Sequence, residues 1–184
     1  MALKSTIHKV ELSLADTLRH YYAEHSLTLA LHPSETEERM MVRLFAFMLH
    51  ADERLGFGKG VSTDDEPALW LKDETEAIRL WIDVGLPDER RIRKACGRAD
   101  AVQIYLYGAL ADKWWRDNEA AMNALNKVSV FTLPDTAALK SLCQRNMKLQ
   151  CTVTEDAIWL SDVSANAREA DSFSLHCKAL KLAE

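Results

Sequence analysis

The fold is decided by one stretch, IRLWIDVGLPDERRIRKACGRADAVQIYLY, which spans residues 78–107. Its first seven residues alternate between aliphatic side chains and a second set that includes Asp83, which is the two-residue period of a strand. Asp88 is a suitable N-cap for a helix that extends to about residue 98, and the β-branched and aromatic residues 101–107 predict a second, buried strand. A strand, a helix and a strand in this order predict one right-handed parallel crossover.

The chain before this stretch predicts a hairpin and a helix. Two segments with alternating apolar residues, 10–14 and 27–31, predict an antiparallel pair of strands. Ser34 and Glu37 have the spacing of a capping box ahead of an apolar run, which predicts a helix over 35–51. Three short strands then follow, at about 55–61, 68–72 and 78–84.

The chain after the crossover predicts further helices and strands. They are a helix at about 110–125, a strand at 128–133, a helix opened by Pro134-Asp135, and a hairpin at 147–161 that turns at Glu155-Asp156. Residues 164–184 have a weak pattern, which predicts a loosely packed tail. The predicted order is ββ, α-β-β-β-α-β, then α-β-α-β-β, which is an α/β fold of the α+β type with a mixed sheet.

Composition predicts a single domain over residues 1–184. Of the 184 residues 48% are hydrophobic and 28% are charged, while Gly (6) and Pro (4) are scarce, which excludes collagen-like and disordered classes. The four cysteines show neither a disulfide framework nor zinc-site spacing, and no long apolar segment predicts a signal peptide or a membrane span. We therefore expect a cytoplasmic protein that does not enter a membrane.

Several carboxylates lie in or beside the predicted central strands and the first helix. Asp65 and Glu66 precede one strand, Asp83 lies near the end of the next, and Glu38 lies one turn into the first helix. If the hairpin packs against that helix, these acids converge and suit a hard divalent cation such as Mg²⁺ or Mn²⁺. The alternative interpretation is a set of ordinary solvated acids in turns.

The predicted helix at 87–98 carries a concentration of basic residues in a chain whose net charge is −5. Arg91, Lys94 and Arg98 share one side of this helix, where they could contact phosphate groups of a nucleic acid. A solvated helix face that pairs with neighbouring acids such as Glu89 explains the same pattern.

Four segments together resemble the YaeQ family of bacterial proteins. They are HPSETEERM at 32–40, DEP at 65–67, LWIDVG at 80–85 and PDERRIRKA at 87–95. The resemblance extends from Ala2 to the hairpin that ends at Asp162, which is nearly the whole chain. YaeQ proteins are similar to the PD-(D/E)xK superfamily, so the resemblance implies a restriction-endonuclease-like α-β-β-β-α-β core at about 35–107, with an N-terminal β-hairpin and added C-terminal strands and helices.

The resemblance also implies a set of site residues. In this superfamily an acid on the first helix and acids on two core strands bind the metal, and these positions correspond to Glu38, to Glu66 or Asp65, and to Asp83. The superfamily lysine two residues after the last acid is missing, because that position is Gly85. Lys94 or Arg91 on the following helix could supply the cation instead.

Two functions are consistent with these residues. The first is a Mg²⁺-dependent phosphodiester hydrolase that acts on DNA or RNA, with a catalytic role for Asp83, Lys94 and Arg91. The second is a non-catalytic module of the same fold that binds nucleic acid or a protein partner, for which Gly85 and the negative net charge argue. The oligomeric state is open at this point.

Overall fold

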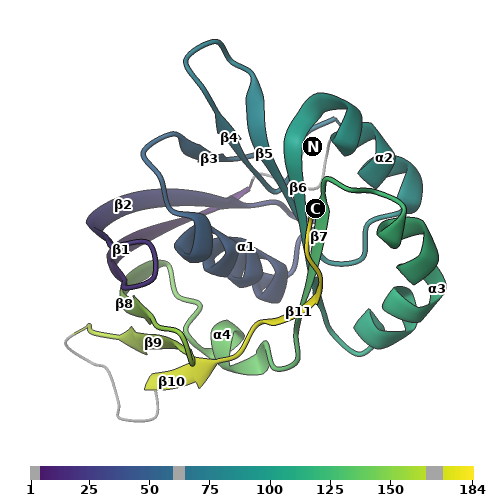
Figure 1. Ribbon diagram of the computed structural model, residues 1–184. Coiled ribbons are helices and arrows are strands. Elements are labelled where there is room, and N and C mark those ends of the chain that lie inside the picture. Colours follow the sequence, from purple (N-terminus) through teal and green to yellow (C-terminus); the bar gives the residue numbers. More distant parts are fainter. Residues whose placement is uncertain (1–4, 60–64, 165–171) are drawn as a thin grey trace. The chain divides into compact units, whose positions relative to one another are not determined.

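The computed structural model describes residues 5–59, 65–164 and 172–184 (Figure 1). The chain divides into two compact units, each with its own β-sheet. Unit 1 comprises Met1–Leu49 and Asp135–His176, and unit 2 comprises His50–Pro134 and Cys177–Glu184. The expectation of a single domain stays a prediction.

Unit 1 contains a five-stranded mixed sheet with the order β10-β9-β8-β1-β2. Its strands are β1 (Thr6–Asp16), β2 (Tyr21–Leu31), β8 (Asn146–Val153), β9 (Ile158–Asp162) and β10 (Ser172–Leu175). The neighbours β1 and β8 are parallel, and the other neighbouring pairs are antiparallel. Alternate residues of β1, such as Val10 and Leu12, are buried while Lys9 and Glu11 are exposed, as expected for a sheet with one solvated face.

Helix α1 (Glu37–His50) packs against this sheet, and α4 (Ala137–Ser141) is a single short helix of the same unit (Figure 1). Phe47 of α1 meets the ring of His25 on β2 edge to face, with ring centroids 5.1 Å apart. The predicted capping box is wrong, because Thr36 and not Ser34 caps α1. The Thr36 hydroxyl accepts from the Arg39 N–H at 3.1 Å, so the helix begins at Glu37.

Unit 2 contains a six-stranded mixed sheet with the order β11-β7-β6-β5-β4-β3. Its strands are β3 (Leu55–Phe57), β4 (Leu69–Lys72), β5 (Ile78–Val84), β6 (Ala99–Tyr107), β7 (Val128–Leu133) and β11 (Lys178–Lys181). Strands β5, β6 and β7 are parallel, whereas β3, β4 and β11 pair antiparallel with their neighbours. The predicted crossover from β5 to β6 is present, and α2 (Glu89–Arg98) forms it.

One face of the unit 2 sheet is covered by α2 and by α3 (Ala111–Asn123) (Figure 1). The buried core there combines Trp81, Val102, Ile104 and Val130 of the strands with Ile92 and Ala95 of α2 and Met122 of α3. Because Trp81 and Asp83 lie on the same face of β5, Asp83 is placed on the side of the sheet that α2 covers.

The predicted mixed α+β class is thus observed, and two predicted elements differ in detail. The strand predicted at 55–61 ends at Phe57, and residues 60–64 lie outside the described part. The expectation of a loosely packed tail is wrong for residues 172–181, because β10 joins the unit 1 sheet and β11 joins the unit 2 sheet. Residues 165–171 of that tail lie outside the described residues.

Candidate functional site

Asp83 lies near the end of β5 and is almost completely buried. Its relative exposure is 3%, and that of its same-face neighbour Trp81 is 1%. The strand continues to Val84 and stops at Gly85, whose φ of +96° is a left-handed conformation that favours glycine. The chain then enters α2, where the Asp88 side chain accepts from the Arg91 N–H at 2.8 Å and fixes the first helical turn.

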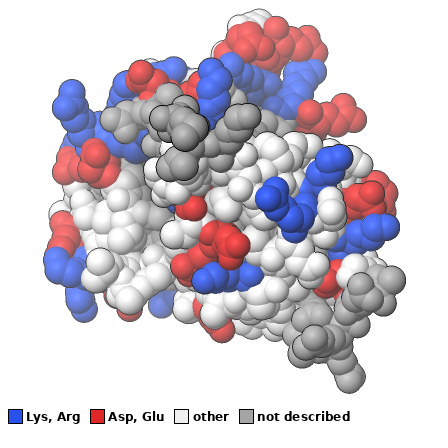
Figure 2. All heavy atoms as spheres, turned by 180° about the vertical axis from the view of Figure 1, so that it is seen from behind, with Lys and Arg blue, Asp and Glu red and all other residues white. Residues whose placement is uncertain are grey.

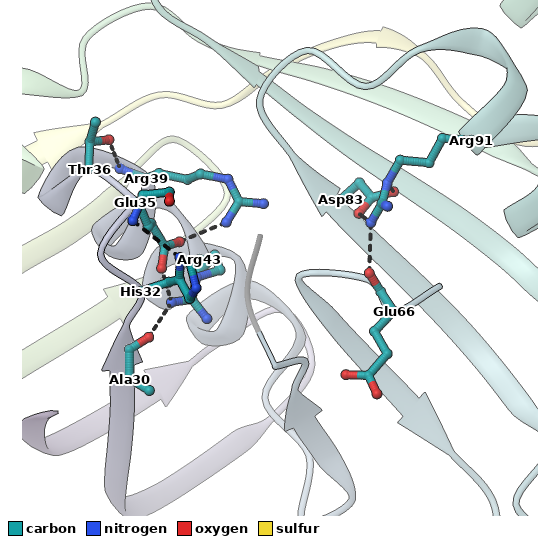
Figure 3. A network of polar contacts seen from close by, with 10 residues as sticks. Ala30, His32, Glu35, Thr36, Arg39, Arg43, Glu66, Asp83 and Arg91 are labelled. Carbon is teal, nitrogen blue, oxygen red and sulfur yellow. Dashed lines mark hydrogen bonds and ion pairs between the residues drawn. The ribbon is translucent and has the colours of Figure 1, made fainter. Parts of the chain in front are cut away.

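The Arg91 side chain projects from this first turn directly onto Asp83 (Figure 3). Its Nε donates to Oδ2 of Asp83 at 2.9 Å, and its Nη2 donates to Oδ1 at 2.8 Å. The indole Nε1 of Trp81 donates to Oδ2 of the same carboxylate at 2.9 Å. Both oxygens of Asp83 therefore accept strong hydrogen bonds, in the two-pronged geometry that guanidinium groups make with carboxylates.

Glu66 contributes to this arrangement through its main chain and not through its carboxylate. Its carbonyl oxygen accepts from Nη2 of Arg91 at 2.7 Å, whereas its side chain points away from Asp83 (Figure 3). The carboxylate accepts from the main-chain N–H of Lys59 at 3.0 Å and lies 3.3 Å from Nζ of the same residue. The Lys59 N–H lowers the pKa of Glu66 below its usual value.

Asp65 pairs with the basic residues of α2. Its carboxylate forms an exposed ion pair with Lys94, and its carbonyl oxygen accepts from Nη1 of Arg98 at 2.7 Å. The hydrogen bond from Lys94 lowers the pKa of Asp65. The Arg98 guanidinium also lies 5.3 Å from the centre of the Trp81 ring, which is cation–π distance. The predicted phosphate-binding residues Arg91, Lys94 and Arg98 thus all contact groups of their own unit.

Glu38 lies on α1 in unit 1, where its carboxylate accepts a hydrogen bond from the Thr136 hydroxyl. Its grouping with Asp65, Glu66 and Asp83 of unit 2 stays a prediction. Within residues 5–59, 65–164 and 172–184, no set of three or more His, Cys, Asp or Glu side chains is arranged to hold a metal ion.

Sequence reasoning missed a buried acid next to Glu38. The Glu35 side chain is fully buried in unit 1, where one oxygen accepts from Arg39 and the other from Arg43, both at 2.7 Å (Figure 3). Arg43 also donates to the Ala30 carbonyl of β2 at 3.1 Å, which connects α1 to the sheet. Burial lowers the pKa of Arg43, while its pairing with Glu35 raises it. A sequence signal was present, since Glu35, Arg39 and Arg43 recur at the four-residue spacing of one helix face.

The sequence model of the family described as YaeQ protein matches residues 1–170. The chain belongs to the YaeQ family. "Uncharacterized protein YaeQ" of Salmonella typhi and the protein of the same name from Escherichia coli (strain K12) are each 46% identical to it over 169 residues. The match covers 90% of this chain and 93% of each relative, so the resemblance seen in the sequence is confirmed.

Two solved structures of YaeQ proteins have the same fold as this chain. "The Crystal Structure of YaeQ Protein from Xanthomonas axonopodis pv. citri" superposes with a TM-score of 0.89 at 42% identity, over 96% of this chain and 98% of that one. "Crystal structure of YaeQ protein from Pseudomonas syringae" gives a TM-score of 0.88 at 33% identity, over 96% of each chain. The two mixed sheets and the helices described above are thus a YaeQ fold.

Among the helices of the described residues, none has both the length and the apolar character needed to cross a bilayer.

Proposed function

We propose that this YaeQ chain is a non-catalytic module on a restriction-endonuclease-like α-β-β-β-α-β core, and that it binds a protein partner. The observation that carries this proposal is the two-pronged ion pair between Arg91 and Asp83. A guanidinium at 2.8–2.9 Å supplies the positive charge that a divalent cation would supply to a carboxylate. Asp83 is then a structural residue that joins β5 to α2.

The ligand geometry around Asp83 supports this role. A metal ion needs lone pairs of several oxygens that face one point, and Mg²⁺ demands near-octahedral placement. Both oxygens of Asp83 already accept hydrogen bonds, and the Glu66 carboxylate is turned toward Lys59. In this arrangement the candidate acids of unit 2 do not fit a shared cation.

The conformation of Gly85 supports the same role. The superfamily lysine would stand at this position, but a φ of +96° is strained for any residue with a Cβ. Space is not the obstacle, since the nearest heavy atom to an added Cβ is Tyr107 Cε1 at 3.8 Å. The left-handed turn at Gly85 therefore suits a short loop into α2 and disfavours a lysine at this position.

The charge distribution favours a protein partner over a nucleic acid. The net charge is −5, and three basic residues of α2 pair with groups of their own unit: Arg93 with Glu89, Lys94 with Asp65, and Arg98 with the Asp65 carbonyl. Figure 2 shows acidic and basic side chains interspersed on the face that it displays, with no broad area of one sign. Nucleic-acid binding relies on a continuous basic surface, because phosphate contacts dominate its affinity.

The second candidate is a Mg²⁺-dependent phosphodiester hydrolase, which is favoured by the observed order α1-β3-β4-β5-α2-β6. In that case Glu66 or Asp65 and Asp83 would hold the metal, and Lys94 or Arg91 would stabilise the charge that develops on the phosphate.

The two candidates are separated by a Mn²⁺ titration of the wild-type protein, Asp83→Asn and the exposed control Glu119→Gln, followed by electron paramagnetic resonance. The proposal expects no saturable binding in any of the three proteins. It also expects no cleavage of single- or double-stranded DNA or RNA with Mg²⁺ or Mn²⁺, and no retention of these nucleic acids at physiological salt. Saturable Mn²⁺ binding that only Asp83→Asn loses, together with metal-dependent cleavage, would establish the hydrolase instead.

A further inference from the structure

The outer strand of the unit 1 sheet, β2, is long and regular. It has 11 residues and pairs along its whole length with β1, in a register without any shift. No other strand of the described chain lies on its second side, since β2 ends the order β10-β9-β8-β1-β2. An edge strand of this length presents a row of main-chain donors and acceptors.

The hydrogen bonds of β1 reveal which residues of β2 face this open edge. The Lys9 N–H donates to the Arg145 carbonyl at 2.9 Å, on the side of β8, so the main-chain groups of Lys9 point away from β2. Lys9 stands opposite Thr28, and in an antiparallel pair the residue opposite such a position also points its groups away. The N–H and C=O of Thr28 therefore face the open edge, as do those of Glu24 and Ser26 by the same alternation.

The contacts of the edge agree with this assignment. The Ala30 carbonyl, which the alternation also places at the edge, accepts from Arg43 at 3.1 Å and not from β1. Within the described ranges of the chain, the main-chain groups of Glu24, Ser26 and Thr28 make no hydrogen bond outside the β1–β2 ladder. These groups form a continuous template for another strand.

The side chains of β2 that face α1 are also incompletely covered. Tyr21, Ala23, His25, Leu27 and Leu31 of this face are half-buried, whereas Val10, Leu12 and Leu14 on the same face of β1 are buried. A strand added beside β2 would cover this apolar strip as well as the main-chain groups.

β2 lacks most of the features that normally protect an edge strand, and Glu24 is its single acidic residue. Its sequence, YYAEHSLTLAL at 21–31, contains no Pro, Lys or Arg, and its pairing contains no bulge. Natural sheets use such residues and bulges to prevent pairing with another chain. Their absence indicates that pairing at this edge is tolerated or used.

We propose that the open edge of β2 pairs antiparallel with β2 of a second copy of this chain, about a two-fold axis at Ser26. This inference does not depend on the proposed function. Ser26 is the middle residue of the strand, so the axis uses the whole length of both copies. The opposed pairs are Ser26 with Ser26, Glu24 with Thr28, Tyr22 with Ala30, Ala23 with Leu29 and His25 with Leu27.

The chemistry of the opposed pairs identifies the second copy as the partner. The two-fold axis places each Glu24 opposite an uncharged Thr28, so no like charges meet. The half-buried Ala23 and Leu27 meet apolar or aromatic side chains of the same face. An isologous interface must be self-complementary in this way, which most edge strands with alternating charges are not.

The test is sedimentation velocity of the full chain over about 1 to about 300 µM, a range in which weak dimers show concentration dependence. We expect the wild-type protein to move reversibly from monomer to dimer across this range. A wild-type protein that stays monomeric at the highest concentration would overturn the proposal.

Two variants act on the edge and leave unit 1 intact. In Ser26→Pro the lost N–H faces the open edge, where proline is tolerated, and in Ser26→Lys two like charges meet on the two-fold axis. Both are expected to weaken the dimer by about tenfold or more at unchanged circular dichroism. The control Gln150→Lys adds the same charge to an exposed position of β8 and should dimerise as wild type. A dimer that survives both Ser26 variants, or that Gln150→Lys also abolishes, would contradict strand pairing at β2.

Amide hydrogen exchange locates the interface independently. The amide protons of Glu24, Ser26 and Thr28 should exchange rapidly at low protein concentration and become protected as the dimer forms. Those of Ala23, Leu27 and Leu29 face β1 and should be protected at every concentration. A dimer in which the first set stays unprotected would place the interface elsewhere and refute the proposal.

Discussion

Replacement of Asp83 by Asn tests whether this carboxylate is a structural partner of Arg91 or a ligand awaiting a metal. Three donors converge on its two oxygens: Nε and Nη2 of Arg91, and Nε1 of Trp81. Asn offers one acceptor oxygen and one donor group, so at least one of the three N–H groups would face another N–H. The Asp83 side chain is 4% exposed and that of Arg91 is 20% exposed, so water compensates only in part.

The magnitude follows from these contacts. Hydrogen bonds to charged groups contribute about 1.5 to 3 kcal/mol each, and the removal of one partner of a buried ion pair costs about 3 to 5 kcal/mol. Because Arg91 keeps some exposure and Asn keeps one acceptor, we expect Asp83→Asn to lower the free energy of unfolding by about 2 to 4 kcal/mol. Arg91→Met should have a similar effect, and the double variant should fall short of the sum by about 1 to 3 kcal/mol.

The assay is urea unfolding followed by circular dichroism. With a slope of about 2 kcal/mol per molar urea, the midpoint should fall by about 1 to 2 M in Asp83→Asn. Arg93→Met is the matched control on the same helix, since the Arg93–Glu89 pair is about half exposed and its loss should cost no more than about 0.5 kcal/mol. Acids that converge to bind a metal repel one another when the metal is absent, so replacing one of them would stabilise the fold. An Asp83→Asn variant that is more stable than wild type would therefore refute the structural role.

Three further outcomes follow from the described contacts. Glu35→Gln should lower the free energy of unfolding by about 3 to 5 kcal/mol, because it removes a fully buried charge that pairs with Arg43. Urea unfolding measures this change, and a decrease below about 1 kcal/mol would contradict the prediction. The hydrogen bond from the Thr75 hydroxyl lowers the pKa of the Asp73 carboxyl from 3.8 to about 2. The stabilisation that the ionised carboxylate gives to the folded protein is present above the unfolded-state pKa and is lost as the pH falls through the folded-state pKa. The urea midpoint of wild type should therefore fall more steeply than that of Asp73→Asn between about pH 4 and about pH 2, and parallel curves would refute this. Burial raises the pKa of Cys151 to about 12, so iodoacetamide at about pH 8 should label this thiol in urea but not in the folded protein, as mass spectrometry can show.

The elements with a strong period could be predicted from the sequence. In strands β1 and β5 the side-chain type alternates over seven or more residues. Helix α2, between β5 and β6, begins directly after Asp88, which caps it as expected. The start of α1 was misplaced because both Ser34 and Thr36 are good caps. The contacts of Glu35 decide between them: Arg43 of the same helix pairs with its side chain, and its N–H closes a turn onto the His32 carbonyl at 2.8 Å, so the helix begins only after it.

The tail was misjudged for a different physical reason. Strands β10 and β11 have four residues each, too few for a period to stand out. They are stabilised by contacts with residues that are distant in sequence. One example is the hydrogen bond from Nζ of Lys181 in β11 to the Val128 carbonyl at 2.7 Å. Strands at the edges of sheets depend on such pairing more than on their own composition.

The residues around Asp83 show that the sequence alone does not decide whether a carboxylate binds a metal or an arginine. The acids near the end of β5 are the same whether they bind a metal or an arginine, and a count of carboxylates does not separate the two cases. The separating feature is the short connection from Val84 to the N-cap Asp88, because it places the first turn of α2 beside the end of the strand. The third residue of that helix then points back to the strand, and here it is Arg91. An arginine at this position after so short a connection competes with any metal for Asp83, so the identity of residue 91 carries more information about the site than the number of acids around it.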